Sequence, residues 1–160
     1  MADGVLITRA LAEADVAAVA GLFADYAASL DIDLDYQGFA GELAALPGAY
    51  APPRGLLLLA RGDDGAALGC VACRPLPEAG ACEMKRLFVA PAGRGLGLGR
   101  RLVRRLIAEA TALGYHEMRL DTLARMGAAQ ALYRAEGFAP MAPYYDTPVP
   151  DTVFLRRALA

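Results

Sequence analysis

The sequence predicts an α/β fold: a mixed β-sheet, antiparallel in its N-terminal part and parallel in its C-terminal part, flanked by about four helices. Three observations lead to this prediction. Strand-like segments follow one another closely between residues 56 and 89, as in an antiparallel meander. Further along, strand-like and amphipathic segments alternate, as in the strand-helix-strand unit of a parallel sheet. The 160 residues contain no repeat or low-complexity linker, so we expect one domain over residues 1–160.

The N-terminal third carries one strand and two helices. Residues 5–9 are predicted to form the first strand, and Glu13 and Asp15 then occupy the first turn of a helix, where the helix dipole favours acidic side chains. A second, short helix is expected to end at Pro47 and Gly48. Apolar residues of the first helix recur at helical spacing and form one face: Val16, Val19, Phe23, Tyr26 and Leu30.

Turn residues delimit the central strands. Residues 56–61 and 66–74 are predicted to form a hairpin around the Gly62-Asp63-Asp64-Gly65 turn. Residues 81–89 form the third strand of the meander. The antiparallel part of the sheet therefore ends with this strand.

The C-terminal half alternates between helix and strand. After a glycine-rich connection, leucines along one side indicate a helix over residues 98–113, ended by Gly114. The remaining expected elements are a strand, a helix and a last strand, at residues 116–121, 128–136 and 152–159.

Composition excludes several classes of protein. Charged residues make up 21% and the formal net charge is −2, which excludes an acidic disordered chain and a generally basic nucleic-acid-binding protein. The longest run of bulky apolar residues, 56–60, is far shorter than the roughly 18 residues of a membrane span. The first residues lack the basic and apolar pattern of a signal peptide. We therefore expect neither nucleic-acid nor membrane partners.

The cysteines indicate a reducing environment. Three cysteines are too few for a disulfide framework, so a cytoplasmic location is expected. Cys70 and Cys73 fall on a predicted strand, where positions three apart face opposite sides, so neither a redox pair nor a zinc site is expected.

A glycine-rich turn is the most informative stretch. Glycines stand at positions 93, 95, 97 and 99, directly between a predicted strand and a predicted helix. The first amides of a helix have no partner within it, and the helix dipole adds positive potential there. Glycines also let the main chain approach a bulky anion. A phosphate or pyrophosphate is therefore the natural ligand.

Other glycine-rich patterns compete with this interpretation. A P-loop needs Gly-Lys-Ser/Thr, but Gly99 is followed by Arg100 and Arg101. A dinucleotide-binding turn needs G-x-G-x-x-G, and its possible registers place Leu98, Arg100 or Leu102 where the third glycine belongs. A glycine-rich surface turn without a ligand is the remaining alternative.

The pattern Arg94-x-x-Gly97-x-Gly99 resembles a motif of the GNAT superfamily of acetyl-coenzyme A-dependent N-acetyltransferases. The preceding strand end, Leu87-Phe88-Val89, is similar to the same superfamily. So is Ala129-x-x-Leu132-Tyr133-x-x-x-Gly137-Phe138, which resembles its last helix. The resemblance extends to the element order over most of the chain, and parts of it are similar to a subset of small bacterial members. It implies a GNAT-like sheet and a single N-acetyltransferase domain.

The resemblance implies acetyl-CoA as the cosubstrate and no metal. Main-chain groups of Leu87, Phe88 and Val89 would pair with the pantetheine arm like an added strand, and one amide there would polarise the thioester carbonyl. The pyrophosphate would lie on the amides of the turn, with charge-assisted contacts from its arginines. The cofactor-binding residues implied are Arg94, Gly95, Leu96, Gly97, Leu98, Gly99 and Arg100, joined by Ala129 and Leu132 of the last helix.

Two side chains would carry the chemistry. Tyr133 would be the general acid, because a phenol can protonate a departing thiolate whose thiol parallels that of cysteine. Glu83 would be the general base, on the same strand as the thioester-binding residues. The alternative for it is a structural ion pair with Lys85, Arg86 or Arg119. Asp121 is a weaker candidate base. Met126 stands where many members carry Asn, which removes a polar contact from that position.

The function implied is transfer of an acetyl group from acetyl-CoA to a primary amine of a small molecule, by direct attack in a ternary complex. A coenzyme A-binding sensor or interaction module with the same fold is the alternative. Many members of the superfamily are dimers, so the resemblance is compatible with a homodimer. Candidate residues on the acceptor side are Tyr36, Tyr144, Tyr145, Asp31, Asp33 and Asp35.

Overall fold

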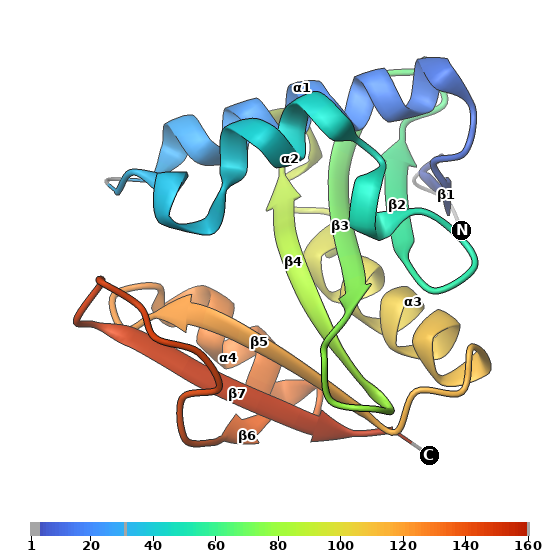
Figure 1. Cartoon of the computed structure of the whole chain (residues 1–160). Coiled ribbons are helices and arrows are strands. Elements are labelled where there is room, and N and C mark those ends of the chain that lie inside the picture. Colours follow the sequence, from blue (N-terminus) through green and yellow to red (C-terminus); the bar gives the residue numbers. More distant parts are fainter. Residues whose placement is uncertain (1–3, 31, 160) are drawn as a thin grey trace.

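Seven strands form one sheet in the order β1-β2-β3-β4-β5-β7-β6 in the computed structural model, which describes residues 4–30 and 32–159 (Figure 1). The strands are β1 (Leu6–Arg9), β2 (Leu56–Arg61), β3 (Ala67–Pro75), β4 (Ala81–Val89), β5 (Glu117–Leu123), β6 (Ala139–Pro140) and β7 (Thr152–Ala158). The helices are α1 (Glu13–Ser29), α2 (Phe39–Ala45), α3 (Leu98–Ala112) and α4 (Gly127–Ala135). Short 3-10 helices lie at η1 (Leu34–Gln37), η2 (Gly48–Tyr50) and η3 (Pro91–Gly93).

The sheet is mixed, as predicted, but its parallel part is small. From β1 to β4, each strand pairs antiparallel with the next one in the chain, and β4 pairs parallel with β5. The predicted last strand is β7, and it runs antiparallel to β5. Strand β6 in turn pairs antiparallel with β7. The chain after α4 reverses through β6 and the segment that follows it, so β7 enters the sheet from the opposite end and no further crossover helix is needed.

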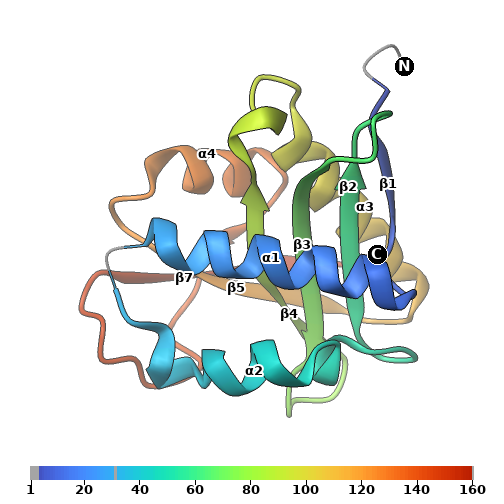
Figure 2. The same cartoon turned by 90° about the horizontal axis from the view of Figure 1, so that it is seen from above.

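Helices cover both faces of the sheet. Figure 2 shows α1 and α2 over one face, with α3 and α4 behind the other. Val19 and Phe23 of α1 pack with Leu57 and Leu59 on the first face. The second face is packed by leucines of α3 and by residues of β4, β5 and α4. Cys70 and Cys73 fall in opposite cores, as the strand alternation predicts.

The helix faces follow the predicted spacing. Leu98, Leu102 and Leu106 of α3 are buried, and Leu113 packs on the edge of the same core. In α1 the fully buried side chains are Val19, Leu22 and Phe23, whereas the other members of the predicted face are half-buried. No helix in the described part of the chain is both long and apolar enough to cross a membrane.

Candidate active site

Strands β4 and β5 pair only at their N-terminal ends. Pairing runs from Ala81–Glu117 to Glu83–Arg119. Beyond these pairs the strands diverge, as Figure 1 shows. The remainder of β4 is paired with β3 on its other side alone, within the described residues. An open strand edge therefore lines the gap, with main-chain donors and acceptors available to an extended ligand.

The alternation along β4 decides which main-chain groups reach the gap. The amide of Ala90 donates to the carbonyl of Leu68 on β3 at 2.9 Å. Alternate residues of a strand direct their N–H and C=O groups to opposite neighbours. Leu87 and Val89 therefore direct these groups into the gap, whereas those of Phe88 are directed towards β3. The expectation that Phe88 offers its main chain to the pantetheine arm is therefore corrected to Leu87 and Val89 alone. The ring of Phe88 lies edge-on to Tyr26 of α1.

A β-bulge interrupts β4 at Arg86. Its φ is +61°, and the register between β3 and β4 shifts at this point. A bulge places two successive side chains on the same side of the strand. Lys85 and Arg86 accordingly both donate to Gln37 Oε1, at 3.1 and 2.7 Å. The bulge thus brings two cationic groups to one wall of the gap.

The glycine-rich turn has the shape expected of an anion site. Gly95 and Gly97 have φ of +84° and +68°, and no atom lies within 4 Å of a Cβ built on either. The first hydrogen bond of α3 runs from the amide of Arg101 to the carbonyl of Gly97 at 3.1 Å. The amides of residues 98–100 therefore precede the hydrogen-bond ladder of the helix. The turn faces open space, and beside it lie amides of the helix start for which the described residues supply no hydrogen-bond acceptor.

Close packing joins this turn to α4. A Cβ at Gly99 would lie 3.2 Å from Leu132 Cδ2, so only a residue without a side chain fits here without displacement. Leu132 packs against the core and Ala129 faces the cavity described below. Leu132 therefore packs α4 against the start of α3, whereas Ala129 lines the cavity.

The arginines near the turn differ in their partners. Arg94 and Arg100 are exposed, and Arg100 Nε lies 3.5 Å from Glu136 Oε2. Arg104 Nε donates to the same carboxylate at 2.9 Å. Glu136 therefore draws both side chains of α3 towards the end of α4, whereas the exposed Arg94 has no ion pair with a described residue.

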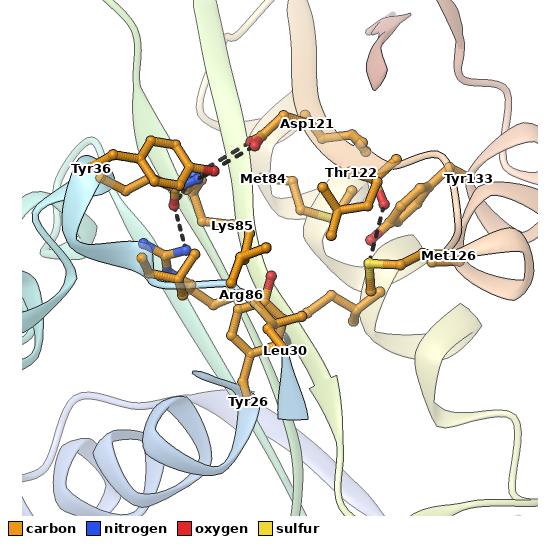
Figure 3. Close-up of a pocket in the computed structure, with 17 residues that line it drawn as sticks. Tyr26, Leu30, Tyr36, Met84, Lys85, Arg86, Asp121, Thr122, Met126 and Tyr133 are labelled. Carbon is orange, nitrogen blue, oxygen red and sulfur yellow. Dashed lines mark hydrogen bonds and ion pairs between the residues drawn. The ribbon is translucent and has the colours of Figure 1, made fainter. Parts of the chain in front are cut away.

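One cavity lies between the diverging strands. Its lining comes from α1, η1, β4, β5 and α4, and it encloses about 700 Å³ including its open mouth (Figure 3). The lining includes Lys85, Arg86, Asp121 and the tyrosines Tyr26, Tyr36 and Tyr133 among the polar residues. The apolar lining residues are Leu30, Ile32, Leu34, Met84, Leu87, Leu120, Leu123, Met126 and Ala129.

Tyr133 reaches this cavity from α4. Its side chain is buried and meets Phe138 edge-on, with the ring centroids 6.0 Å apart. Burial raises the pKa of its hydroxyl above 10, and the charge of Asp121 acts in the same direction. The hydroxyl therefore stays protonated at neutral pH. A protonated phenol in the cavity can donate a proton or a hydrogen bond.

Asp121 faces Lys85 across the gap. Lys85 Nζ lies 3.4 Å from Asp121 Oδ1, and both side chains are nearly buried. The other carboxylate oxygen accepts from the Tyr145 hydroxyl at 2.8 Å and from Gln37 Nε2 at 3.5 Å. Figure 3 shows Lys85 and Asp121 directed towards each other in the cavity. An ammonium group from β4 and a carboxylate from β5 thus form an ion pair at the cavity.

Arg86 is matched by a carboxylate outside the cavity lining. Its Nε and NH2 groups donate to the two oxygens of Glu42, each at 3.0 Å. This bidentate pair compensates the buried guanidinium charge. The ring of Phe39 lies 5.1 Å below the same group.

The structure does not bring Glu83 into the cavity. This side chain is buried, with 1% of its surface exposed, and it is absent from the cavity lining. Arg74 Nε donates to Oε1 at 2.8 Å and the Tyr144 hydroxyl donates to Oε2 at 2.6 Å. Both oxygens are therefore occupied by structural partners. The predicted base role of Glu83 loses its geometric support. Glu83 does form an ion pair, but its partner is Arg74 and not the expected Lys85, Arg86 or Arg119.

The acceptor-side candidates are placed in different ways. Tyr36 lines the cavity, and Tyr145 acts behind it on Asp121. Asp33 instead accepts from the amide of Asp35 at 2.9 Å and caps η1. Asp31 lies outside the described residues. Met126 lines the cavity, with its sulfur 3.8 Å from Thr122 Oγ1.

Four residues of the cavity network were missed from the sequence. These are Gln37, Glu42, Lys85 and Arg86, which join η1, α2 and β4. One signal was present: Lys85 is the only lysine in a chain with 15 arginines, and it stands beside Arg86 in the middle of a predicted strand. The positive φ of Arg86 and its pairing with Glu42 have no local signature.

Comparison with known proteins decides the family. The acetyltransferase (GNAT) family model matches residues 12–138. The chain belongs to this family. An uncharacterised N-acetyltransferase of Schizosaccharomyces pombe is 44% identical to this acetyltransferase over 135 residues, which cover 84% of this chain and 83% of that protein.

Solved structures share the fold of this GNAT chain. A GNAT-family acetyltransferase of Staphylococcus aureus has a TM-score of 0.80 at 19% identity, and the match covers 98% of this chain and 99% of that one. An acetyltransferase of Salmonella typhimurium, solved with its cofactor acetyl-CoA, has a TM-score of 0.71 at 23% identity and covers 98% and 95%. The predicted GNAT-like architecture is confirmed.

Proposed function

We propose that this acetyltransferase moves an acetyl group from acetyl-CoA to a primary amine of a small molecule, by direct attack of the amine in a ternary complex. One observation carries the proposal. The open edge of β4 and the Tyr133 hydroxyl of α4 meet at one cavity. The free amides at the start of α3 lie next to α4. The complex of the Salmonella typhimurium protein with acetyl-CoA supports the choice of donor.

The residues of the chain fit the two ends of this donor. The amides of residues 95–100, with Arg94 beside them, suit a pyrophosphate, because they combine free N–H groups with the positive end of the helix dipole. The main-chain groups of Leu87 and Val89 suit an amide-containing arm that lies along β4 as an added strand. Ala129 and Leu132 keep α4 in place beside it.

The transfer forms one bond and breaks another. The lone pair of the neutral amine attacks the thioester carbonyl carbon, a C–N bond forms, and the C–S bond breaks. Tyr133 supplies a proton to the leaving sulfur, because its raised pKa keeps the hydroxyl protonated. The main-chain groups of β4 hold the thioester within reach of the amine, which lowers the entropic part of the barrier.

Asp121 takes the place of Glu83 as the acceptor of the amine proton in this proposal. Asp121 lines the cavity, whereas the Glu83 carboxylate is held by Arg74 and Tyr144. An ammonium group that enters the cavity is attracted by the Asp121 carboxylate and loses its proton to it or to a water molecule beside it.

A thiol-release assay tests the function. The purified chain is mixed with acetyl-CoA and separately with amino acids, monoamines, polyamines and aminoglycosides, and free thiol is measured against Tyr133→Phe as the matched control. We expect turnover with at least one amine and a large loss in the variant. Saturable binding of acetyl-CoA without turnover of any amine would favour the sensor alternative, and binding of NAD instead would overturn the assignment of the turn.

A further inference from the structure

We propose that the acceptor is an α-amino acid with an apolar side chain, whose carboxylate is bound by Lys85 and whose amine is bound by Asp121. This inference rests on the proposed function and narrows its substrate. It follows from the charges on the cavity wall, their partners and the apolar residues around them.

Lys85 offers a buried donor to an anion. Only 5% of its side chain is exposed, and the residue lines the cavity. An ammonium group has three N–H donors. Two of them are used on Gln37 Oε1 at 3.1 Å and Asp121 Oδ1 at 3.4 Å. Within the described part of the chain no third acceptor is recorded, so one N–H remains for a ligand oxygen.

Asp121 offers the complementary acceptor. Its side chain is 11% exposed and receives Lys85 on one oxygen and the Tyr145 hydroxyl on the other. A carboxylate has about four lone-pair positions, so it can accept a further hydrogen bond from an ammonium group. Tyr145 fixes the orientation of the carboxylate without filling its capacity.

The separation of these two charges suits a zwitterion. Lys85 Nζ and Asp121 Oδ1 are 3.4 Å apart. The amine nitrogen and the carboxylate oxygens of an α-amino acid are separated by two carbon atoms, which gives a distance of the same scale. An amino acid can therefore lie antiparallel to the Lys85–Asp121 pair, with each of its charges against the opposite charge of the wall.

Charge excludes polyamines from the same position. Arg86 is compensated by Glu42, so the cavity has no acidic side chain beyond Asp121 in its described lining. A second cationic group of a ligand would lie near the Lys85 ammonium, which repels it, and would find no further carboxylate in this lining. The rest of the wall favours an apolar side chain, through Leu30, Ile32, Leu34, Leu120 and Leu123.

The reaction also assists product release under this arrangement. The amide nitrogen of an N-acetyl amino acid carries no positive charge, so its attraction to Asp121 is lost when the C–N bond forms. The Lys85 contact to the carboxylate persists. The pair therefore distinguishes substrate from product by one charge.

Matched acceptor pairs test the inference. The wild-type protein is assayed by thiol release with phenylalanine against phenethylamine, and with leucine against 3-methylbutylamine. Each pair differs only by the carboxylate. We expect kcat/KM to be about 10- to 100-fold higher for the amino acid, the range set by one charge-assisted hydrogen bond. Putrescine should be a poor acceptor.

Lys85→Met then assigns the effect to one side chain. The variant should reduce the ratio of kcat/KM for each amino acid to that for its decarboxylated amine by about 10- to 100-fold, mainly through the KM of the amino acid, because an effect of the substitution on Asp121 acts on both substrates alike. Arg134→Met, on the exposed side of α4, removes a positive charge outside the cavity and should leave both substrate types unaffected. Calorimetry with acetyl-CoA checks that the donor site is intact.

Two results would overturn the inference. Equal kcat/KM within each wild-type pair, which needs no variant, would show that the carboxylate is not recognised. An equal loss of both substrate types in Lys85→Met would assign the residue a structural role. Turnover of amines alone overturns the inference and leaves the proposed function standing, whereas turnover of no acceptor overturns both.

Discussion

The Tyr144 hydroxyl donates to Glu83 Oε2 at 2.6 Å, and this hydrogen bond holds the Glu83 carboxylate outside the cavity. The contact joins the irregular segment before β7 to the middle of the sheet. Tyr144 is half-buried, and its partial burial together with the charge of Glu83 raises the pKa of its hydroxyl, so it remains a donor at all ordinary pH values. Glu83 is thereby fixed as an acceptor for Tyr144 and Arg74.

Glu83→Gln should lower stability without removing catalysis. The amide keeps one acceptor but places an N–H group against a donor, and loss of a hydrogen bond to a charged group costs about 1.5–3 kcal/mol. Urea unfolding should report this loss in the free energy of unfolding. The pH dependence of kcat/KM should keep its wild-type shape.

Asp121→Asn is the matched change in the cavity. It removes the carboxylate that faces Lys85, and we expect kcat/KM to fall about 100- to 10,000-fold, the usual contribution of a positioned base. Acetyl-CoA affinity should change little. A larger kinetic loss in Glu83→Gln than in Asp121→Asn would return the base role to Glu83.

Tyr133→Phe removes only the hydroxyl oxygen from a buried ring. We expect kcat to fall about 100- to 10,000-fold with an almost unchanged acetyl-CoA dissociation constant. The pKa of Tyr133 is raised, so its protonated form persists to higher pH than that of a free phenol, at about 10. The wild-type rate should accordingly show no alkaline decline below about pH 10. A decline near pH 8 that disappears in the variant would contradict the assignment.

Met126→Asn should stabilise the start of α4. Met126 is the N-cap of this helix and makes no side-chain capping bond. An Asn at an N-cap accepts from the first amides and adds about 0.5–2 kcal/mol relative to a residue that cannot cap. The unfolding temperature should rise relative to Met126→Leu, which tests the loss of sulfur alone. Equal temperatures for the two variants would show that the φ and ψ of this residue prevent capping.

Acid should destabilise the protein through Glu109. Hydrogen bonds from Arg105 and Arg9 lower the pKa of this carboxyl. The contribution of Glu109 to the free energy of unfolding is therefore complete above the pKa of the unfolded state, about 4.3. It is lost as pH falls through the lower pKa of the folded state. Urea unfolding between pH 6 and pH 3 should show a shallower decline for Glu109→Gln than for the wild type. Parallel curves would show that the pair adds nothing to stability.

Local patterns explain which elements were predictable. Residues 56–61 and 81–89 have the predicted bounds because turn residues enclose each segment. The α3 helix was predictable because the spacing of its leucines and the positions of the flanking glycines indicate the same helix. The direction of β7 was not, since it depends on the path of the segment between α4 and β7. The two-residue β6 contains Pro140 and carries no strand pattern.

The candidate site divides in the same way. The turn and Tyr133 belong to short motifs, so their positions followed from spacing. The partners of Glu83 did not, because Tyr144 lies 61 positions away on an irregular segment. The bulge at Arg86 likewise depends on pairing with β3, and it decides which main-chain groups and side chains face the cavity.

Calorimetric titration of acetyl-CoA into the wild-type protein and Gly97→Glu tests the central claim most directly. The carboxylate would occupy open space in the unliganded turn and repel the pyrophosphate, and two charges nearby are worth about 3 kcal/mol, or a loss of about 100-fold in affinity. Gly97→Ala controls for the cost of a side chain at positive φ. We expect saturable binding of acetyl-CoA to the wild type and to Gly97→Ala. For Gly97→Glu we expect a similar unfolding temperature but no detectable binding at the same concentrations. Equal affinity of the wild type and Gly97→Glu would contradict the claim.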